Sequence, residues 1–574
     1  MYQPPIEDYD FLYRNVFGDE VLHTLSDGEL KTEDARDILT TAADLAVQMM
    51  HPLNRLGDRV GSTLADGKVT TPPGFVQAYR SFAEGGWVGL GIDAEIGGGG
   101  VPVMLYNAVS EMWTAANVAF SLCWGLSTAA ITALQSAASD ELKATYLPKM
   151  VTGEWTGTMN LTESQAGTDL ASIRTTARPA EDGSWRVRGQ KIFITWGDHD
   201  LAENIIHLVL ARTPDAPEGL RGLSLFVVPK FLPDENGNPG DRNRVTTLAL
   251  EDKLGIHASP TCVLEYDDAV GFLVGEQNRG LSAMFVMMNN TRIGVGLQGL
   301  GIADRAYQQA RDYAQQRIQG KVFGRGAAAP IAEHPDVARL LLSMSSSISA
   351  MRAFSVQLGE WVDRSMLQGS SETEQLVEFF VPVMKAWFTE EAVRIASDGI
   401  QVHGGMGFIE ETGAAQHYRD ARILPIYEGT TAIQSNDLLG RKLFRDKGAT
   451  VTLALEMIGR DIARLRESSD PVAVRTAERL DRALECTRDT THTLLMLALN
   501  DPRDAFAGSV AYLSMIALVA GAWMHARIVA ATVTTSTEFT DADRRRLREA
   551  DFYGAHHLSR VHSLAESIRG GEIR

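Results

Sequence analysis

The strongest constraint on the fold is a double change in hydrophobic spacing along the chain. Residues 31–150 carry apolar side chains at helical spacing, residues 155–275 change to short runs of β-branched and aromatic residues, and helical spacing returns at Leu281. Runs such as Trp185–Arg188 and Leu223–Val228, bounded by turn residues, predict strands. The order helix, strand, helix predicts an α+β protein of several domains, in which the strands form a small barrel or sandwich.

The same changes of spacing indicate the domain boundaries. With 574 residues, the chain is long enough for several domains of about 150 residues each. We expect an N-terminal all-α domain over 1–154, a middle β domain over 155–276, a helical bundle over 277–445 and a helical extension over 446–574. The extension is either an additional helical domain or a dimerisation element.

Composition narrows the class of partner and the compartment. The net charge of −19 argues against nucleic acid, whose phosphates bind basic surfaces, but leaves room for an anionic small molecule in a local basic pocket. The three cysteines form no zinc or disulfide pattern, and the 13 histidines show no metal-ligand spacing. Because the N-terminus also lacks the basic and apolar regions of a signal peptide, we expect a cytoplasmic protein with no metal.

Two long uncharged runs are comparable in length with membrane spans. Residues 112–139 and 505–526 are both long enough to cross a bilayer. Small and hydroxyl-bearing residues dilute both runs, which is typical of helices buried on nearly all sides of a large helical protein. We therefore expect no stable membrane insertion, with a membrane-surface role for the second run as the alternative.

Two motif matches fail in their context. Gly294–Gly299 has the spacing of the dinucleotide-binding fingerprint, but that fingerprint requires a preceding strand, and here the glycines lie within a helical run. Small residues in this place favour close packing of helices. Asp234–Asn238 resembles half of an EF-hand loop, but the sixth position is Pro239 and the twelfth is Val245, so we expect a turn.

Three segments are candidates for ligand binding. Met159–Asp169 joins the end of a strand to hydroxyl residues and glycine, which suits a planar heteroaromatic ring or a phosphate, although an ordinary Ser/Thr turn has the same composition. Asp398–Gly407 ends a helical run with glycines, which form either a C-cap or a close approach to a pyrophosphate. Arg292 and Arg317 are 25 residues apart, which predicts one helix face carrying both and binding anionic ligands.

Glu428 is the candidate catalytic residue. It follows the apolar run Ile423–Ile426 and precedes Gly429–Thr431, so its carboxylate lies where water is scarce. Burial raises the pKa of a carboxyl group and makes it a usable base. The structural alternative is a helix-start glutamate that complements the helix dipole.

Together these segments resemble the acyl-CoA dehydrogenase family, in the order that family uses, over roughly residues 35–445. The resemblance rests on Asn160–Glu163 with Gly167–Asp169, Lys191–Thr195, Lys253–Gly255, Gln401–Gly407 and Tyr427–Thr430. The opening residues and the long C-terminus are similar to the larger subclass, which includes long-chain and 3-(methylthio)propanoyl-CoA dehydrogenases.

The resemblance implies a binding site for FAD and one for acyl-CoA. The implied FAD contacts are Met159, Leu161, Thr162, Gly167, Thr168, Phe193, Thr195 and Thr430 of one subunit, with Arg317, Gln401, Val402, Gly404 and Gly405 of its neighbour. The implied acyl-CoA contacts are Thr168, Asn289, Arg292, Tyr427 and Gly429. Because two subunits supply the FAD contacts, the active unit would be at least a dimer.

The resemblance also implies the reaction, a step of fatty acid β-oxidation. Glu428 would remove the α-proton of an acyl-CoA thioester, the β-hydrogen would leave as hydride to flavin N5, and the electrons would pass to an electron-transfer flavoprotein. The Glu428 N–H and a flavin ribityl hydroxyl would bind the thioester oxygen. Some family members carry the base on the long helix, where this chain has Thr291, which keeps Glu428 as the expected base.

Two alternatives stay open, an acyl-CoA oxidase that uses oxygen and a catalytically silent member that serves as a scaffold through its helical tail. The chain also departs from the family pattern. Ile318–Gly320 intervene after Arg317, Pro335 stands where a cofactor-binding glutamine is common, and Trp196 follows Thr195. These departures predict altered cofactor contacts between subunits and an altered wall near the flavin.

Overall fold

The structure, a computed structural model, describes residues 2–323, 326, 328–535 and 538–570. The chain forms two compact units, each assembled from several stretches of sequence. The sheet unit consists of Leu45–Val101 and Ala116–Gly294, and the helical unit consists of Met1–Asp44, Pro102–Ala115 and Val295–Arg574. The chain therefore passes repeatedly from one unit to the other.

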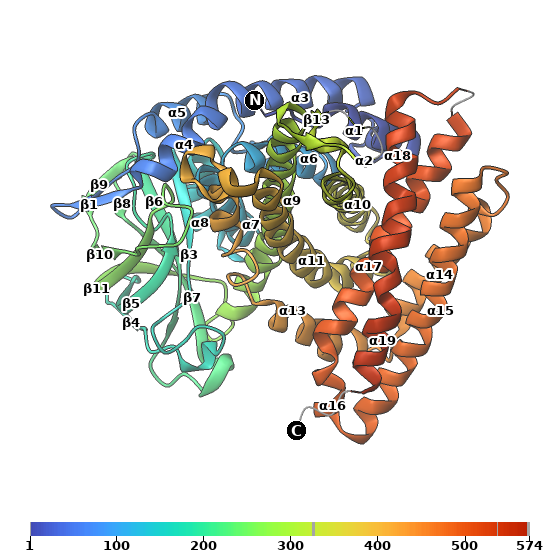
Figure 1. Ribbon diagram of the computed structural model, residues 1–574. Coiled ribbons are helices and arrows are strands. Elements are labelled where there is room, and N and C mark those ends of the chain that lie inside the picture. Colours follow the sequence, from blue (N-terminus) through green and yellow to red (C-terminus); the bar gives the residue numbers. More distant parts are fainter. Residues whose placement is uncertain (1, 324–325, 327, 536–537, 571–574) are drawn as a thin grey trace. The chain divides into compact units, whose positions relative to one another are not determined.

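The sheet unit is built around one seven-stranded sheet (Figure 1). Its strands are β3 (Trp155–Asn160), β4 (Thr176–Pro179), β5 (Trp185–Thr195), β6 (Asn204–Arg212), β7 (Leu223–Pro229), β10 (Val245–Leu250) and β11 (Thr261–Val274). The strand order is β10-β11-β5-β4-β6-β3, and β7 pairs with both β11 and β6. Five strands thus form a closed ring, which confirms the predicted small barrel or sandwich in the middle of the chain.

Strand β6 explains how this sheet is packed. Residues 204–211 of β6 are all buried, as expected for a strand that is covered on both faces. Val209 belongs to the apolar cluster inside the ring, whereas Leu208 belongs to a second cluster that includes Ala130 and Met150 of the covering helices. Alternate residues of one strand therefore enter two different cores.

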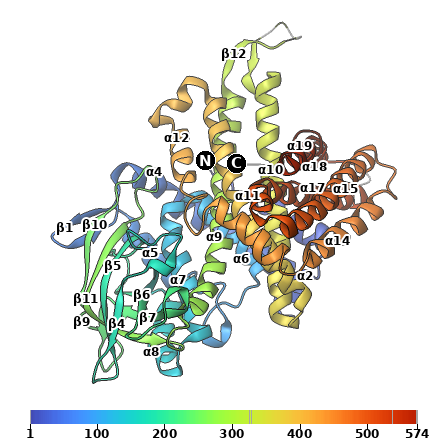
Figure 2. The ribbon, with the colours of Figure 1, turned by 90° about the horizontal axis from the view of Figure 1, so that it is seen from below.

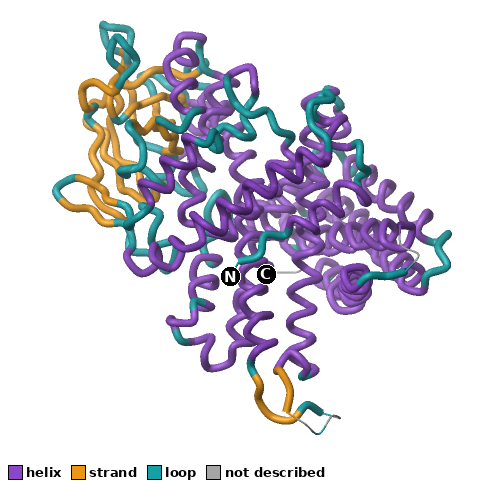
Figure 3. Tube along the Cα trace, turned by 90° about the horizontal axis from the view of Figure 1, so that it is seen from above, coloured by secondary structure: helices purple, strands orange, loops and turns teal. Residues whose placement is uncertain are grey.

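Helices and two short hairpins complete the sheet unit, and Figure 3 shows the strands gathered together. The elements are α4 (His51–Val60), β1 (Thr63–Ala65), β2 (Lys68–Thr70), α5 (Phe75–Glu84), α7 (Val118–Ala137), α8 (Asp140–Val151), β8 (Phe231–Pro233) and β9 (Pro239–Arg242). The β1–β2 hairpin interrupts a stretch for which helical spacing was expected. Asp234 accepts hydrogen bonds from the N–H groups of Asn236 at 2.9 Å and Asn238 at 2.8 Å, which makes this segment the predicted turn.

Helix α7 packs closely on strand β3. It begins at Asn117, whose side chain accepts a hydrogen bond from the Phe120 N–H at 3.1 Å and caps the helix. A Cβ atom at Gly157 of β3 would lie 2.6 Å from the Cβ of Ala130. Glycine at this position therefore allows the helix to approach the sheet.

The helical unit contains a bundle of long helices. Its elements before the C-terminal extension are α1 (Ile6–Phe11), α2 (Val21–Leu25), α3 (Thr32–Leu45), α6 (Val103–Ala116), most of α9 (Gly280–Gln316), β12 (Ile318–Lys321), β13 (Ala328–Pro330), α10 (Pro335–Gln368), α11 (Ser371–His403), α12 (Ala414–Ala421) and α13 (Thr431–Asp437). The fold class is thus α+β, as predicted.

The glycines of residues 294–299 lie inside α9, which excludes the dinucleotide fingerprint. A Cβ atom at Gly299 would lie 2.6 Å from the carbonyl oxygen of Phe388 on α11. A Cβ atom at Gly296 would lie 3.1 Å from the Cε of Met384 on the same helix. These glycines allow the two helix backbones to cross at short distance, which is the packing role expected for them.

We expect Gly299→Ala to destabilise the protein by about 1–3 kcal/mol, because the new Cβ meets backbone atoms of α11. Urea unfolding followed by circular dichroism measures the change. The matched control is Gly459→Ala in α14 (Ala449–Leu465), where the nearest atom is 3.7 Å away. That substitution should be neutral or stabilising by up to about 1 kcal/mol. Equal effects of the two substitutions would contradict the close crossing of α9 and α11.

The C-terminal extension shares a core with the bundle. It consists of α14, α15 (Pro471–Asn500), α16 (Pro502–Ala507), α17 (Ser509–Thr535), α18 (Asp541–Phe552) and α19 (Val561–Arg569). Helix α17 packs against α15, α18 and α19 and also against α10, α11 and α13 of the bundle (Figure 1). Between α18 and α19 the chain forms a π-helical segment, Tyr553–His557, and a 3-10 segment, Leu558–Arg560.

Two helices of the described chain have the length and composition of membrane spans, Val118–Ala137 and Ser509–Thr535. They coincide with the two uncharged runs of the sequence. In each, 78% of the most apolar window is buried inside the protein. This burial agrees with the expectation that both are core helices.

Helix α9 differs from the expectation at its C-terminal end. The helix ends at Gln316, so Arg317 lies just beyond the face that carries Arg292. The Arg317 N–H still donates to the Tyr313 carbonyl at 2.9 Å and closes the last turn. The next residues pair as β12 with β13, and this hairpin draws the chain out of the helix.

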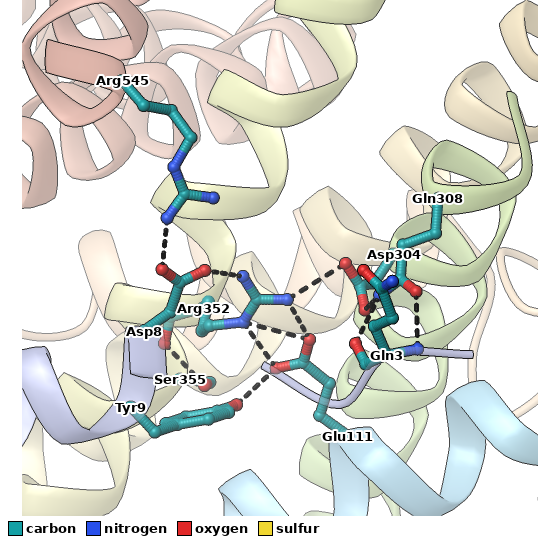
Figure 4. A network of polar contacts seen from close by, with 9 residues as sticks. All are labelled: Gln3, Asp8, Tyr9, Glu111, Asp304, Gln308, Arg352, Ser355 and Arg545. Atoms are coloured by element: carbon teal, nitrogen blue, oxygen red, sulfur yellow. Dashed lines mark hydrogen bonds and ion pairs between the residues drawn. The ribbon is translucent and has the colours of Figure 1, made fainter. Parts of the chain in front are cut away.

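A buried set of charges connects distant segments of the helical unit (Figure 4). Arg352 of α10 forms ion pairs with Glu111 of α6 at 2.5 Å, with Asp8 of α1 at 3.1 Å and with Asp304 of α9 at 3.2 Å. Asp8 also pairs with Arg545 of α18. Burial raises the pKa of Asp304 to about 6, against the opposing attraction of Arg352. Ion pairs of two arginines therefore connect the N-terminal helix with the bundle and with the extension.

Candidate active site

Glu428 lies half-buried in the turn between α12 and α13. Its backbone is left-handed, with φ of 56°, and Gly429 follows with φ of 93°. This conformation is uncommon for a residue with a side chain and persists where the surrounding structure enforces it. Thr430 is the N-cap of α13, and its hydroxyl accepts a hydrogen bond from the Ile433 N–H at 3.4 Å. Because Glu428 precedes the cap, the helix-start alternative does not describe it.

Two side chains hold the carbonyl groups of this turn. Lys385 of α11 is fully buried and donates from Nζ to the carbonyl oxygens of Leu424 at 2.8 Å and Gly429 at 2.7 Å. Gln434 of α13 donates from Nε2 to the carbonyl oxygens of Glu428 at 3.0 Å and Gly429 at 3.1 Å. Two helices thus fix the backbone around Glu428.

Lys385 and Gln434 were not among the residues predicted from the sequence. A signal for Lys385 was present, because it is the single charged residue in the apolar run Phe379–Phe388. Lysine is almost never fully buried unless it is paired, so such an isolated lysine predicts a specific partner. No comparable signal marks Gln434, since an amide side chain in a short helix is ordinary.

Tyr427 connects the turn to the long helix α9. Its hydroxyl donates a hydrogen bond to the side chain of Gln298. Burial, together with the negative charges of Glu428 and Asp420, raises the pKa of Tyr427. The phenol therefore stays protonated and remains a hydrogen-bond donor beside the candidate base.

A second group of predicted residues lies at the ends of α9 and α11. Gln401, Gly404 and Gly405 are exposed, Val402 is buried, and Arg317 is exposed with its guanidinium 3.2 Å from the side-chain oxygen of Gln319. No described atom lies within 4 Å of a Cβ built at Gly404 or Gly405. This backbone is open to a close approach by a ligand.

An apolar surface surrounds these residues. The hairpin of β12 and β13 extends beyond the ends of α9 and α10 (Figure 2). Ile318 and Phe323 of this region are 57% and 92% exposed, and Met406 and Phe408 are 50% and 84% exposed. We call these four residues the hairpin surface. Each of these large apolar side chains is at least half exposed.

In the sheet unit, four of the predicted FAD contacts lie in the loop after β3, and a fifth, Met159, lies near the end of β3 itself. The base of this loop is fixed because Lys191 of β5 donates to Glu163 at 2.8 Å and to the Leu161 carbonyl at 2.9 Å. Met159 and Thr162 are half-buried, whereas Gly167 and Thr168 are exposed. No described atom lies within 4 Å of a Cβ built at Gly167. The loop is thus anchored at its base and open at its far end.

We expect Glu163→Gln to lower the free energy of unfolding by about 3 kcal/mol at neutral pH, because Lys191 is left buried without its counter-charge. Burial opposes the ionised form, but Lys191 and the hydrogen bonds from Thr175 and Arg174 lower the pKa of Glu163 to about 2. The contribution of this carboxylate is therefore complete above its unfolded pKa and disappears as the pH falls towards about 2. The difference between variant and wild type should shrink over that range.

Urea unfolding at neutral pH and at about pH 3.5 measures this dependence. The control is Glu181→Gln, an exposed residue in the turn between β4 and β5, which should be neutral at both pH values. A difference for Glu163→Gln that is small, or independent of pH, would contradict the role of the buried pair.

Phe193 projects from a bulge in β5. The register between β5 and β11 shifts between Cys262 and Leu264, and Phe193 has a φ of 58°. Bulges of this kind redirect a side chain and occur next to active sites. The ring of Phe193 is 58% exposed, so the bulge presents an aromatic face to a ligand. Thr195 follows and is half-buried.

Trp196, which was expected to alter the wall near the flavin, is a buried residue. The residue is 1% exposed, and its Nε1 donates to the Ala119 carbonyl at 3.1 Å. The indole is therefore packed inside the sheet unit, against the first turn of α7.

The remaining predicted residues lie in the first part of α9. Asn289 is exposed, and Arg292 is 6% exposed. Thr291 donates from Oγ1 to the Met287 carbonyl at 2.8 Å, so its hydroxyl serves the helix backbone. Because threonine has no side-chain carboxylate, Glu428 remains the candidate base.

The predicted residues fall into two groups by compact unit. The β3 loop, Phe193, Thr195, Asn289 and Arg292 belong to the sheet unit. Arg317, residues 401–405 and residues 427–430 belong to the helical unit. Within the described residues, no group of three or more His, Cys, Asp or Glu side chains has the geometry to hold a metal ion. The first group suits an aromatic ligand, and the second places a carboxylate for proton transfer.

Four family models match consecutive parts of the chain. Their descriptions are "Acyl-CoA dehydrogenase, N-terminal domain" over residues 32–154, "Acyl-CoA dehydrogenase, middle domain" over 158–269, "Acyl-CoA dehydrogenase, C-terminal domain" over 278–443 and "Acetyl-CoA dehydrogenase C-terminal like" over 454–573. The domains are therefore those of an oxidoreductase of the kind that dehydrogenates CoA thioesters. The chain belongs to the acyl-CoA dehydrogenase family.

Relatives over nearly the whole length agree with this membership. The 3-methylmercaptopropionyl-CoA dehydrogenase of Ruegeria pomeroyi is 48% identical over 530 residues, which cover 91% of this chain and 90% of that protein. The broad-specificity linear acyl-CoA dehydrogenase FadE5 of Mycobacterium tuberculosis is 32% identical and covers 99% of this chain and 97% of its own. The Bacillus anthracis acyl-CoA dehydrogenase, solved in complex with FAD, has the same fold, with a TM-score of 0.77, 21% identity and coverage of 95% and 90%.

Proposed function

We propose that the protein converts an acyl-CoA thioester to the trans-2-enoyl-CoA, with FAD as cofactor and Glu428 as the base. The main support is the left-handed turn in which Lys385 and Gln434 fix the backbone on either side of Glu428. A general base must be held within hydrogen-bond reach of the proton that it removes. A glutamate on an ordinary surface turn needs no such support.

Glu428 would act on the carbon next to the thioester carbonyl. The proton on this carbon is weakly acidic, so its removal requires donors to the carbonyl oxygen, where negative charge develops. By the family pattern, the Glu428 N–H is one such donor. The carboxylate accepts the α-proton, the β C–H bond breaks with its electron pair as hydride, and a carbon–carbon double bond forms. FAD, when bound, supplies the acceptor for that hydride.

The residues of the site suit FAD. The exposed ring of Phe193 and the open backbone at Gly167 provide a stacking face and a close approach for a flat heteroaromatic ring. The exposed Arg317 and the open backbone at Gly404 and Gly405 suit a diphosphate. We propose that this second set serves the cofactor of a neighbouring subunit, as the family pattern implies.

We propose that the protein is a homodimer joined at the hairpin surface. The four apolar residues of that surface lie on the same segments as Arg317 and Gln401–Gly405, which the family pattern assigns to the neighbour's FAD. Burying them against a second copy removes apolar area from water and brings these residues to the partner.

The experiment that tests the function is anaerobic mixing of the purified protein with acyl-CoA substrates. We expect a yellow protein whose flavin colour bleaches with substrate. A silent scaffold would show no bleaching. We propose an electron-transfer flavoprotein as the acceptor, and production of hydrogen peroxide in air at the rate of substrate oxidation would instead indicate an oxidase.

The substrate range is tested by flavin reduction across an acyl-CoA series. The 48% identity to a 3-methylmercaptopropionyl-CoA dehydrogenase makes that thioether the first substrate to compare with straight-chain acyl-CoA. We propose that the reaction belongs to fatty acid or related acyl-CoA degradation in the cytoplasm.

A further inference from the structure

We propose that Lys385 is a positioning residue for Glu428, which closes the turn around the base and keeps the Glu428 carboxylate in its ionised form. The inference rests on the proposed function of Glu428. It assigns a role to a side chain that belongs to none of the motifs by which the site was predicted.

The two hydrogen bonds of Lys385 support its role in closing the turn. The two carbonyl groups that accept from Lys385, those of Leu424 and Gly429, lie on opposite sides of Glu428 in the sequence. One ammonium group therefore joins the two ends of the turn. The Gly429 carbonyl also accepts from Gln434, so the peptide next to the base has a donor from each of two helices.

The burial of Lys385 supports a role for its charge. The residue is 0% exposed within an apolar stretch of α11. Burying an ammonium group is costly, and a neutral donor would hold a carbonyl group at lower cost. A positive charge is useful here because it favours the ionised form of a nearby carboxylate, an effect that is strong where water is excluded.

Charges of both signs surround the turn, and Arg422, an exposed residue, lies at its start. Asp420 of α12 and Glu428 both act on the Tyr427 hydroxyl, and Glu390 of α11 accepts a hydrogen bond from Thr431 at 2.5 Å. Negative charges such as Asp420 and Glu390 disfavour an ionised Glu428, and positive charges such as Lys385 and Arg422 favour it. Of these two cations Lys385 is buried and Arg422 is exposed, so water screens Lys385 less. Without Lys385, Glu428 should need a higher pH to act as a base.

The test compares Lys385→Met with Gln434→Met. Both remove a donor from the Gly429 carbonyl, but only the first removes a charge. We expect both to slow flavin reduction by about ten- to a hundred-fold, since small displacements of a catalytic group have effects of this size. Stopped-flow measurement against pH should show the acid limb of Lys385→Met moved up by about one unit and that of Gln434→Met unmoved.

Two further variants complete the design. Lys385→Gln keeps a donor without the charge, so it should recover part of the rate while keeping the shifted pH limb. Lys442→Met, which removes a lysine paired with Glu378 on the partly exposed face of α11, should change neither rate nor pH limb. An unshifted limb in Lys385→Met would overturn the role of the charge, and an unchanged rate would overturn the positioning.

Hydrogen exchange gives a readout that is independent of activity. The Tyr427 and Thr431 N–H groups donate to the carbonyl groups of Ile423 at 3.1 Å and Pro425 at 3.2 Å. Lys385→Met should speed their exchange, and Lys442→Met should not. If acyl-CoA fails to bleach the wild type, the proposed function fails, whereas unchanged exchange in Lys385→Met overturns the positioning of the turn by itself.

Discussion

Glu428→Gln should bind FAD and acyl-CoA normally. Its rate of flavin reduction should be lower than that of the wild type by on the order of a thousandfold or more. Glutamine has nearly the same shape as glutamate but cannot accept the α-proton. The turn should keep its geometry, because Lys385 and Gln434 hold the carbonyl groups of Leu424, Glu428 and Gly429. Anaerobic stopped-flow spectroscopy at the flavin absorbance band measures the rate, and titration with acyl-CoA measures binding.

The control for this substitution is Glu378→Gln, a glutamate of α11 whose side chain is 52% exposed. It should reduce flavin at the wild-type rate. Flavin reduction by Glu428→Gln within about tenfold of the wild type would assign the base to another residue.

Arg352→Met should give the largest loss of stability, about 3–5 kcal/mol. The substitution leaves Glu111, which is 0% exposed, and the buried Asp304 without their cation. A single charge left in the interior is costly to bury, which is the cause of the expected loss. Urea unfolding followed by circular dichroism measures the free energy of unfolding.

Two further variants test whether the buried charges cause this loss. Arg339→Met removes an arginine whose ion pair with Asp336 is solvent-exposed, and it should change stability by no more than about 1 kcal/mol. Arg352→Met combined with Glu111→Gln should recover part of the loss, because one of the unpaired charges is then removed. If Arg352→Met were as mild as Arg339→Met, the buried ion pairs would contribute little to the fold.

Helices and strands with a regular spacing of apolar residues could be predicted from the sequence. Strands β5, β6 and β7 cover the predicted β-branched runs, and α10, α11 and α15 cover long stretches of helical spacing. Strand β11 was not among the predicted runs, although it is the longest in the sheet. Its register shifts between Tyr266 and Ala269, and Asp268 there has a φ of 55°. A bulge of this kind breaks the period of two on which the prediction depends.

The candidate site was predictable as a set of motifs but not as a supported structure. Glu428 was identified from its local context, an acidic residue between an apolar run and a glycine turn. The contacts that hold its turn are long-range: Lys385 and Leu424 are 39 residues apart in the sequence. The spacing of apolar residues predicts the structure within one helix or strand and does not predict contacts between distant segments. The hairpin that ends α9 before Arg317 was missed for the same reason, since it depends on pairing with residues 328–330.

The ion pair between Asp8 and Arg545 has a consequence for biosynthesis. The two residues are 537 positions apart, so Asp8 is synthesised long before the arginine that it binds. At about 5–20 residues per second, the ribosome needs roughly 30 to 110 s to synthesise the chain from Asp8 to Arg545. During that time Arg352 of α10 is available to Asp8, but Arg545 is not. A chain that is terminated early, before α18, would leave Asp8 without this partner and should be recognised by chaperones or degraded.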